Sequence, residues 1–111
     1  MIDEATFRRV SDQALESLKQ SLIDAEEEGG FEAEEKNGVL NVLFEDGSAK
    51  FVFTPQTPVR QIWISARTTS FKLEWSEDTS LFTLSKTGED LKTLTERLLR
   101  EQLNDPAIAL R

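Results

Sequence analysis

The chain has 111 residues, a formal net charge of −8, and neither cysteine nor histidine. Those two absences exclude a disulfide framework, thiolate or imidazole metal sites, and the usual catalytic triads, and we expect no haem and no nucleotide. The acidic balance argues against nucleic acid as a partner, and no apolar run approaches the roughly 20 residues that cross a membrane. With no leader-like pattern before Asp3, we expect one cytoplasmic domain over residues 1–111.

The first predicted element is a long helix that Asp3 can cap. Apolar residues recur at helical spacing after it, and Gly29-Gly30 ends the pattern. The residues of this stripe are Phe7, Val10, Ala14, Leu18, Leu22 and Ala25. The spacing predicts a helix with one buried face.

Most of the excess charge lies where this helix ends. Residues 1–46 hold 13 acids and 4 bases, whereas residues 47–111 hold 8 acids and 9 bases. Seven carboxylates and no cation lie between Lys19 and Lys36, and we call residues 20–35 the acidic segment. Acids in the last helical turn face the negative end of the helix dipole, which costs about 0.3–1 kcal/mol each. The segment therefore either solubilises an edge strand or forms a surface for cations and basic partners.

Carboxylates without histidine or cysteine suit hard ions, which include calcium, magnesium, manganese and iron. The candidate metal ligands are Asp24, Glu26, Glu27, Glu28, Glu32 and Glu34. No calcium-loop spacing is present, so we expect weak binding by exposed carboxylates that leave water on the ion.

Two dipeptides, Asn37-Gly38 and Asp46-Gly47, are typical of two-residue hairpin turns. They predict strands at 31–36, 39–45 and 48–54. The cross-strand pairs expected from such turns are Phe31–Phe44, Ala33–Val42, Val42–Phe51 and Leu40–Phe53. Every pair is apolar on one face, and a slip of one residue would destroy this agreement.

The second half of the chain predicts three further strands and a helix. A turn over 55–58 precedes a strand containing Ile62 and Ile64, a second strand containing Phe71, Leu73 and Trp75 follows, and a short one lies around Phe82 and Leu84. Residues 87–90 (TGED) predict a capping box for a last helix that buries Leu91, Leu94 and Leu98. The predicted fold class is α+β, a two-layer sandwich with both helices on one face of a five- to six-stranded antiparallel sheet.

The uncovered face of this sheet carries an aromatic side chain. If Ile62 and Ile64 face the core, Trp63 points outward beside Gln61 and is a natural interface anchor unless a loop covers it. Thr54 and Lys72 should lie on the same face, with Gln56 in the adjoining turn. Trp75 is in phase with Leu73 and is expected in the core.

The chain resembles the frataxin family, most specifically through residues 55–65 (PQTPVRQIWIS). Residues 38–42 (GVLNV), residues 46–48 (DGS) and the opening helix with Asp12 are similar too. The likeness covers nearly the whole chain and is to the bacterial, CyaY-type form. The helix–strands–helix order derived above is the order of the frataxin fold.

The resemblance implies an iron-binding accessory and regulator of iron–sulfur cluster assembly. The implied partners are a cysteine desulfurase (IscS-like), which the acidic surface meets, and an iron–sulfur scaffold protein (IscU-like), which the sheet-face tryptophan meets. The implied partner-binding residues are Thr54, Gln56, Gln61, Trp63, Lys72, Asp12 and Glu16. Iron (Fe²⁺ or Fe³⁺) is implied as a weak, carboxylate-ligated ion, and we expect a monomer that iron could drive into oligomers.

Two other functions compete with this one. Clustered carboxylates could support a ferroxidase or iron-storage activity, although that needs a site with fixed ligands. An acidic mimic of nucleic acid would explain the charge but not Trp63 and its polar neighbours. We favour the non-enzymatic regulator.

Overall fold

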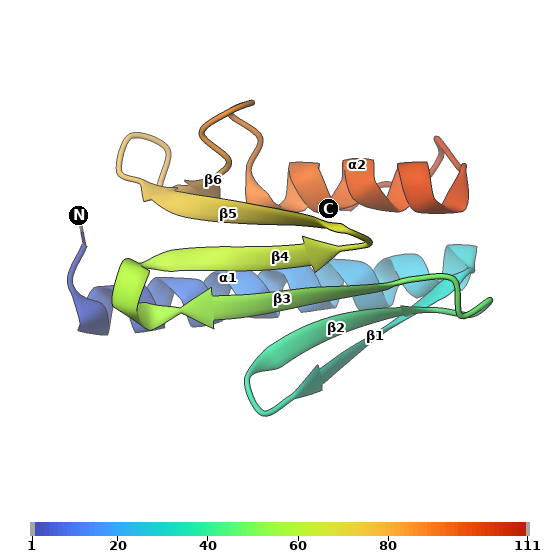
Figure 1. Ribbon diagram of the computed structural model, residues 1–111, viewed down its shortest axis with the longest axis horizontal. Coiled ribbons are helices and arrows are strands. Elements are labelled where there is room, and N and C mark those ends of the chain that lie inside the picture. Colours follow the sequence, from blue (N-terminus) through green and yellow to red (C-terminus); the bar gives the residue numbers. More distant parts are fainter. Residues whose placement is uncertain (1, 111) are drawn as a thin grey trace.

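Residues 2–110 are described by a computed structural model, apart from the side chain of Glu28. A long helix opens the described chain, six strands follow, and a second helix precedes the C-terminal segment (Figure 1). The elements are α1 (Glu4–Ala25), η1 (Glu26–Glu28), β1 (Phe31–Lys36), β2 (Val39–Phe44), β3 (Lys50–Gln56), η2 (Thr57–Val59), β4 (Gln61–Ala66), β5 (Thr69–Ser76), β6 (Leu81–Thr83) and α2 (Leu91–Leu103).

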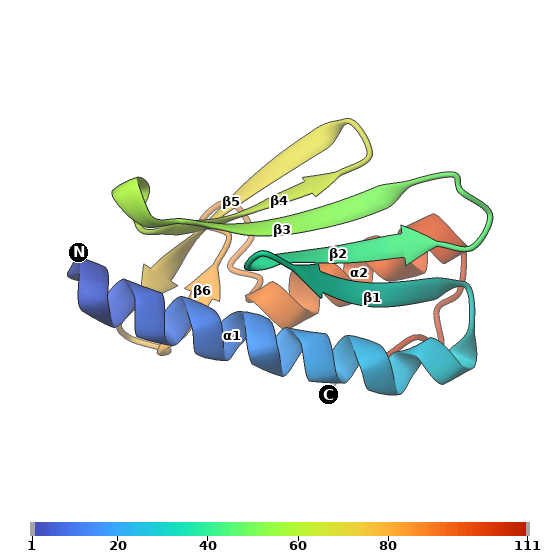
Figure 2. The same cartoon turned by 90° about the horizontal axis from the view of Figure 1, so that it is seen from below.

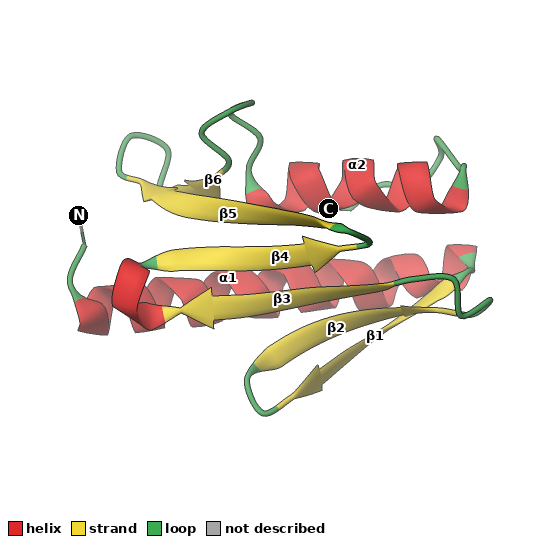
Figure 3. Cartoon of the chain, viewed as in Figure 1, coloured by secondary structure: helices red, strands yellow, loops and turns green. Residues whose placement is uncertain are grey.

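The strands form one antiparallel sheet in the order β1-β2-β3-β4-β5-β6, so every strand neighbours the next in the chain. Both α-helices lie on the same face of this sheet, and no helix of the described residues covers the other face (Figures 2 and 3). We call the uncovered side the open face. The α+β two-layer prediction is confirmed.

The buried side chains form one continuous core between the helices and the sheet. Phe7, Leu18 and Leu22 of α1 are fully buried, as are Leu94 and Leu99 of α2. The sheet contributes Leu40, Val42, Phe51, Phe53, Ile62, Ile64 and Leu73. Because strand residues alternate between faces, burial of this set directs its neighbours onto the open face.

The register of the first hairpin follows from its turn. Asn37 and Gly38 both have positive φ, 54° and 80°, as the favoured two-residue hairpin turn requires. The predicted pairs Phe31–Phe44 and Ala33–Val42 are confirmed between β1 and β2. The predicted pairs Val42–Phe51 and Leu40–Phe53 are confirmed between β2 and β3.

The predicted strand bounds around β3 were wrong by up to two residues. The Asp46 carboxylate accepts a hydrogen bond from the Ser48 N–H at 2.9 Å, which holds the β2–β3 connection in a turn and delays β3 until Lys50. At its other end β3 runs through Pro55 to Gln56, so the predicted 55–58 turn is confined to η2. Pro55 is tolerated in this central strand because it lies beyond the last residue that pairs with β2.

Arg60 connects the η2 turn to the start of the chain. This residue has φ of 57° and ψ of 43° and ends η2. Its Nε–H donates to the Ile2 carbonyl at 3.3 Å, and its Nη1 donates to the Thr57 carbonyl. The guanidinium therefore ties the segment before α1 to the turn between β3 and β4.

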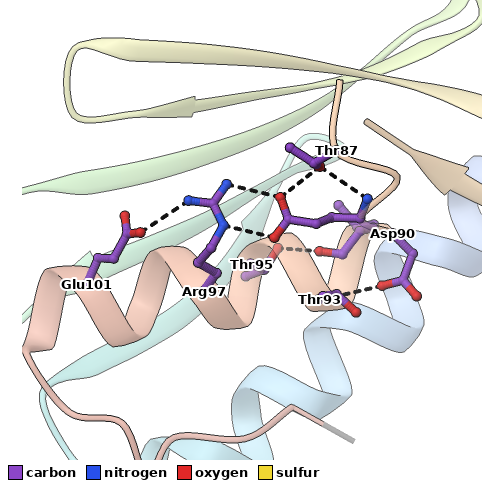
Figure 4. A network of polar contacts seen from close by, with 8 residues as sticks. Thr87, Asp90, Thr93, Thr95, Arg97 and Glu101 are labelled. Carbon is purple, nitrogen blue, oxygen red and sulfur yellow. Dashed lines mark hydrogen bonds and ion pairs between the residues drawn. The ribbon is translucent and has the colours of Figure 1, made fainter. Parts of the chain in front are cut away.

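The two helix starts compare differently with the sequence prediction. Asp3 caps α1 as expected, and its carboxylate accepts the Thr6 N–H at 2.7 Å. The capping box at 87–90 was wrong, because the residue that caps α2 is Asp90, which accepts the Thr93 N–H at 2.8 Å. The Thr87 hydroxyl instead donates to the Glu89 carboxylate and accepts the Glu89 N–H in the connection before α2 (Figure 4).

A charged network locks the β6–α2 connection to α2 (Figure 4). The Arg97 guanidinium donates to both carboxylate oxygens of Glu89, at 2.8 and 3.0 Å, and to Glu101 at 3.1 Å. These bonds from Arg97, with a further one from Thr87, hold the pKa of Glu89 below its ordinary value.

Over the described part of the chain, no helix has the length and apolarity needed to cross a membrane.

Candidate functional site

A single cross-strand row on the open face contains Thr54, Trp63 and Lys72. Thr54 of β3 lies opposite Trp63 of β4, and Trp63 lies opposite Lys72 of β5. The neighbours Ile62 and Ile64 are fully buried in the core, so alternation directs the indole away from the helices. The predicted outward position of Trp63 is confirmed.

The indole ring of Trp63 is held in place by its neighbours. Its Nε1–H donates to the Gln61 side-chain carbonyl at 2.8 Å, and Lys72 Nζ lies 4.9 Å from the ring centroid, within the range of a cation–π contact. The ring is half-buried, and a shallow hollow of about 190 Å³ adjoins it. The hollow is lined by Val52, Thr54, Gln56, Trp63, Ile64, Ser65, Ser70 and Lys72.

Gln56 lies in the next row of the same face, although the sequence prediction placed it in a turn. It is the last residue of β3 and pairs with Gln61, which in turn pairs with Glu74 of β5. Gln56, Gln61 and Trp63 thus present two amides and an indole side by side. Such a surface offers hydrogen-bond donors and acceptors around a central aromatic anchor.

Two carboxylates of the acidic segment lie on this open face as well. Glu32 pairs with Leu43, and Glu34 pairs with Asn41, so both alternate away from Phe31 and Ala33, which face the helices. Both are exposed. With neighbouring strands about 4.8 Å apart, β1 lies roughly 14 Å from β4, so one partner can cover both Glu34 and Trp63.

Asp24 at the end of α1, with Glu26 and Glu27 of η1, belongs to the helical side of the β1 edge. Asp24 and Glu27 are exposed. Glu26 is half-buried, and its Oε1 accepts a hydrogen bond from the Ala33 N–H at 2.6 Å. The side chain of the sixth candidate ligand, Glu28, lies outside the described residues.

Lys19 and Glu35 form an ion pair, Nζ to Oε1 at 3.5 Å, between α1 and β1. Steps of three and four residues along α1 connect Lys19 to Glu16 and Asp12, so those two acids share the side of α1 that meets β1. Both are exposed. Asp12 lies 14 residues before Glu26, roughly 21 Å along the helix, so the α1 acids are spread out rather than clustered.

The carboxylates do not form a compact cage within the described residues, where no group of three or more Asp or Glu side chains is arranged to hold a metal ion. Their chemistry suits hard cations, but each would supply one or two oxygens from a solvated position. The arrangement can bind an ion weakly and can attract a basic protein surface. The metal-ligand and partner roles stay predictions.

Sequence reasoning missed four features of the structure. The Glu26–Ala33 and Lys19–Glu35 contacts join positions far apart in sequence, and no local spacing indicates them. Trp75 was expected in the core but is half-buried, with its ring packed against Phe82 at a centroid distance of 5.2 Å. A groove of about 310 Å³ adjoins Trp75 between α1, β6 and the start of α2.

Known proteins were compared with the chain in sequence and in structure. A family model described as a frataxin-like domain matches residues 1–105. The protein named iron-sulfur cluster assembly protein CyaY from Pseudomonas putida strain F1 is 32% identical over 106 residues, covering 94% of this chain and 92% of its own. The protein of the same name from Azotobacter vinelandii is 30% identical over 106 residues, with the same coverage.

A solved structure of frataxin from Psychromonas ingrahamii shares the fold. It superposes with a TM-score of 0.80 over 98% of this chain and 96% of its own, at 13% sequence identity. The family model spans nearly the whole chain, and relatives above 30% identity align along almost their full length. The chain belongs to the frataxin family.

Proposed function

We propose that the protein is an iron-binding accessory and regulator of iron–sulfur cluster assembly in the cytoplasm. It docks on a complex of a cysteine desulfurase and an iron–sulfur scaffold protein, and it catalyses no reaction of its own. The names of its relatives from Pseudomonas and Azotobacter support the process, and the surface of this chain supports the mode of docking.

The observation that carries the proposal is the fixed indole of Trp63 on the open face. Binding normally costs the conformational entropy of the side chains that it orders. The bond to Gln61 and the contact with Lys72 already order the ring in the free protein, so less entropy is lost on docking. A large apolar ring surrounded by the amides of Gln56 and Gln61 suits the centre of an interface with the scaffold.

The acids of β1 complete the docking surface at its edge. Glu32 and Glu34 extend the open face, and Asp24 and Glu27 continue the negative charge around the edge onto α1. This distribution attracts a basic surface on the desulfurase and accelerates association in a salt-dependent way. One rigid sheet thus presents a charged edge to one partner and an aromatic centre to the other.

Iron is the cargo or signal of this proposal rather than a resident cofactor. The exposed carboxylates Asp24, Glu27, Glu32 and Glu34 hold Fe²⁺ or Fe³⁺ weakly and leave it hydrated. A ferroxidase needs fixed ligands around the oxidised ion, and the described carboxylates are too dispersed to supply them. Iron bound at these acids neutralises charge that the desulfurase would meet, so the two binding equilibria should be linked.

The decisive experiment measures affinity for the preformed desulfurase–scaffold complex by isothermal titration. Trp63→Ala should weaken binding about 100-fold, the range of an interface hot spot. Leu81→Ala removes an exposed apolar side chain of β6 and should leave affinity within twofold. Wild-type affinity in Trp63→Ala would contradict the docking mode. Titrations with and without Fe²⁺ test the linkage, and equal affinities would remove it.

A further inference from the structure

Within residues 2–110, β1 pairs with another strand along one side alone, and its other side is a free edge. β1 is the first strand of the sheet, and the Glu45 N–H donates to the Gly30 carbonyl at 3.1 Å beside it. In an antiparallel ladder the hydrogen-bonded positions alternate, so residues 32 and 34 bond toward β2, as residue 30 does. The N–H and C=O groups of Phe31, Ala33 and Glu35 therefore point to the free edge. Such an edge is a template for pairing with another chain.

The Glu26 carboxylate accepts a hydrogen bond from the Ala33 N–H, the middle of the three N–H groups that point to this edge. Its Oε1 lies 2.6 Å from the Ala33 nitrogen, where the carbonyl oxygen of an added strand would otherwise lie. Glu26 belongs to η1, which follows α1 directly, so the helix end brings the carboxylate to the edge. A hydrogen bond to a charged acceptor is stronger than one between neutral groups.

The edge of β1 is nearly self-complementary about Ala33. Two antiparallel copies centred there would exchange both backbone hydrogen bonds at Ala33, and those bonds need the N–H that Glu26 now holds. The same register would place Glu32 of one copy opposite Glu34 of the other, and like charges directly opposite are destabilising. The pairing is thus opposed by an occupied donor and by charge repulsion.

We propose that Glu26 is an edge guard: its carboxylate closes the free edge of β1 and prevents this strand from pairing with β1 of a second copy. The repulsion between Glu32 and Glu34 is the second barrier, and the Lys19–Glu35 pair fixes the far end of the strand against α1. This role is separate from docking and from iron binding, and it assigns to Glu26 a structural function within the acidic segment.

Amide hydrogen exchange at Ala33 tests, within the monomer, whether the Glu26 carboxylate holds this N–H. In Glu26→Ala the Ala33 amide should exchange at least ~10-fold faster, the loss expected for a bond to a charged acceptor. Glu26→Gln keeps an acceptor oxygen and should stay within about threefold of wild type. Glu27→Ala, a change at the exposed neighbour, should leave Ala33 unchanged. Equal Ala33 exchange in wild type and Glu26→Ala, with both folded, overturns the proposal.

Sedimentation velocity tests whether loss of the Glu26 bond lets two copies pair through β1. Glu32→Gln with Glu34→Gln removes the repulsion but keeps the guard, so this double variant should stay monomeric at about 100 μM. Adding Glu26→Ala should give a dimer in which Ala33 exchange slows again. A monomeric triple variant, a double variant that dimerises equally, or a dimer whose Ala33 amide still exchanges fast would each overturn the proposal.

Discussion

The two edges of the sheet use the same residue types in opposite ways. Beside the β6 edge, a bridge between Thr83 and Asp90 extends the pairing beyond β6, and the neighbouring Glu89 is bonded to Arg97 of α2, which also bonds Glu101 one turn further along the helix. At the β1 edge, the carboxylates Glu32 and Glu34 are exposed, and the acids Asp24 and Glu27 beside them are exposed too.

The difference teaches that a carboxylate's role here depends on whether a donor of the same chain meets it, as Arg97 meets Glu89 and the Ala33 N–H meets Glu26. A carboxylate with a bidentate guanidinium partner stabilises its own fold. Crowded carboxylates without such partners repel one another and lower stability slightly, and they stay available to a cation or a basic partner. Neutralising each edge in turn should separate these two contributions.

The largest expected effect is on partner affinity at the β1 edge. Changing Asp24→Asn, Glu27→Gln, Glu32→Gln and Glu34→Gln together should weaken desulfurase binding roughly 10- to 100-fold, mainly through slower association. Surface plasmon resonance at two salt concentrations measures both rates. Glu101→Gln in α2 serves as the control and should stay within twofold. Equal losses in the two variants would show that only net charge matters.

Arg97 should be the most important charged residue for stability at the β6 edge. Arg97→Met removes the guanidinium that bonds Glu89 and Glu101 and should lower the free energy of unfolding by about 1–2 kcal/mol, since the pair with Glu89 is only partly buried. Urea denaturation measures the change. Arg8→Met removes an exposed i,i+4 pair with Glu4, which has the spacing of the Arg97–Glu101 pair. This change should cost less than about 0.5 kcal/mol. A similar small cost for Arg97→Met would contradict the comparison.

The stabilisation by Glu89 should depend on pH in a defined direction. Because Arg97 lowers the pKa of Glu89 in the folded state, this carboxylate contributes stability above its unfolded pKa, and the contribution is lost as pH falls through the folded value. Glu89→Gln should be less stable than wild type by about 1 kcal/mol at pH 7, and the gap should close below about pH 4. A gap that is constant from pH 7 to pH 3, measured by urea denaturation, would exclude this origin.

Added salt should change the stability least of all. It should stabilise the fold at the β1 edge by screening repulsion and destabilise it at the Arg97 network by screening attraction. Screening relieves repulsion among the β1-edge acids, so 0.5 M NaCl should raise the melting temperature by about 2 °C. The variant with four neutralised acids should lose this gain, since only the weakening of the Arg97 network remains. Calorimetry in phosphate-free buffer makes the comparison. An undiminished gain in that variant would place the repulsion elsewhere.

The fold was largely predictable because short-range rules determined long-range pairing. Asn37-Gly38 accepts the positive φ angles of a two-residue turn, and this turn fixes the opposition of Phe31 and Phe44. The start of α2 was less predictable, since Thr87 and Asp90 are both good capping residues. The backbone decides between them, because Gly88 has a positive φ of 78° and Asp90 forms a β-bridge with Thr83, so the helix starts only after Asp90.

The candidate site was predictable in part for the same reason. Alternation within β4 was enough to place Trp63 on the open face, but the bond to Gln61 that fixes its ring needs side-chain geometry. The acidic segment was evident as charge, yet its division between α1 and the open face depends on where the chain turns. The role of Glu26 depends on a contact with Ala33 that no spacing rule predicts.

The tether from Arg60 to the start of the chain has a practical consequence for anyone who handles the protein. Arg60 donates a hydrogen bond to the Ile2 carbonyl and also ends the η2 turn between Gln56 and Gln61. The beginning of the chain is therefore bonded to the turn that borders the docking surface. A purification tag fused ahead of the chain is attached close to that contact. Measurements of partner binding should therefore use protein whose fusion has been removed or placed at the other end.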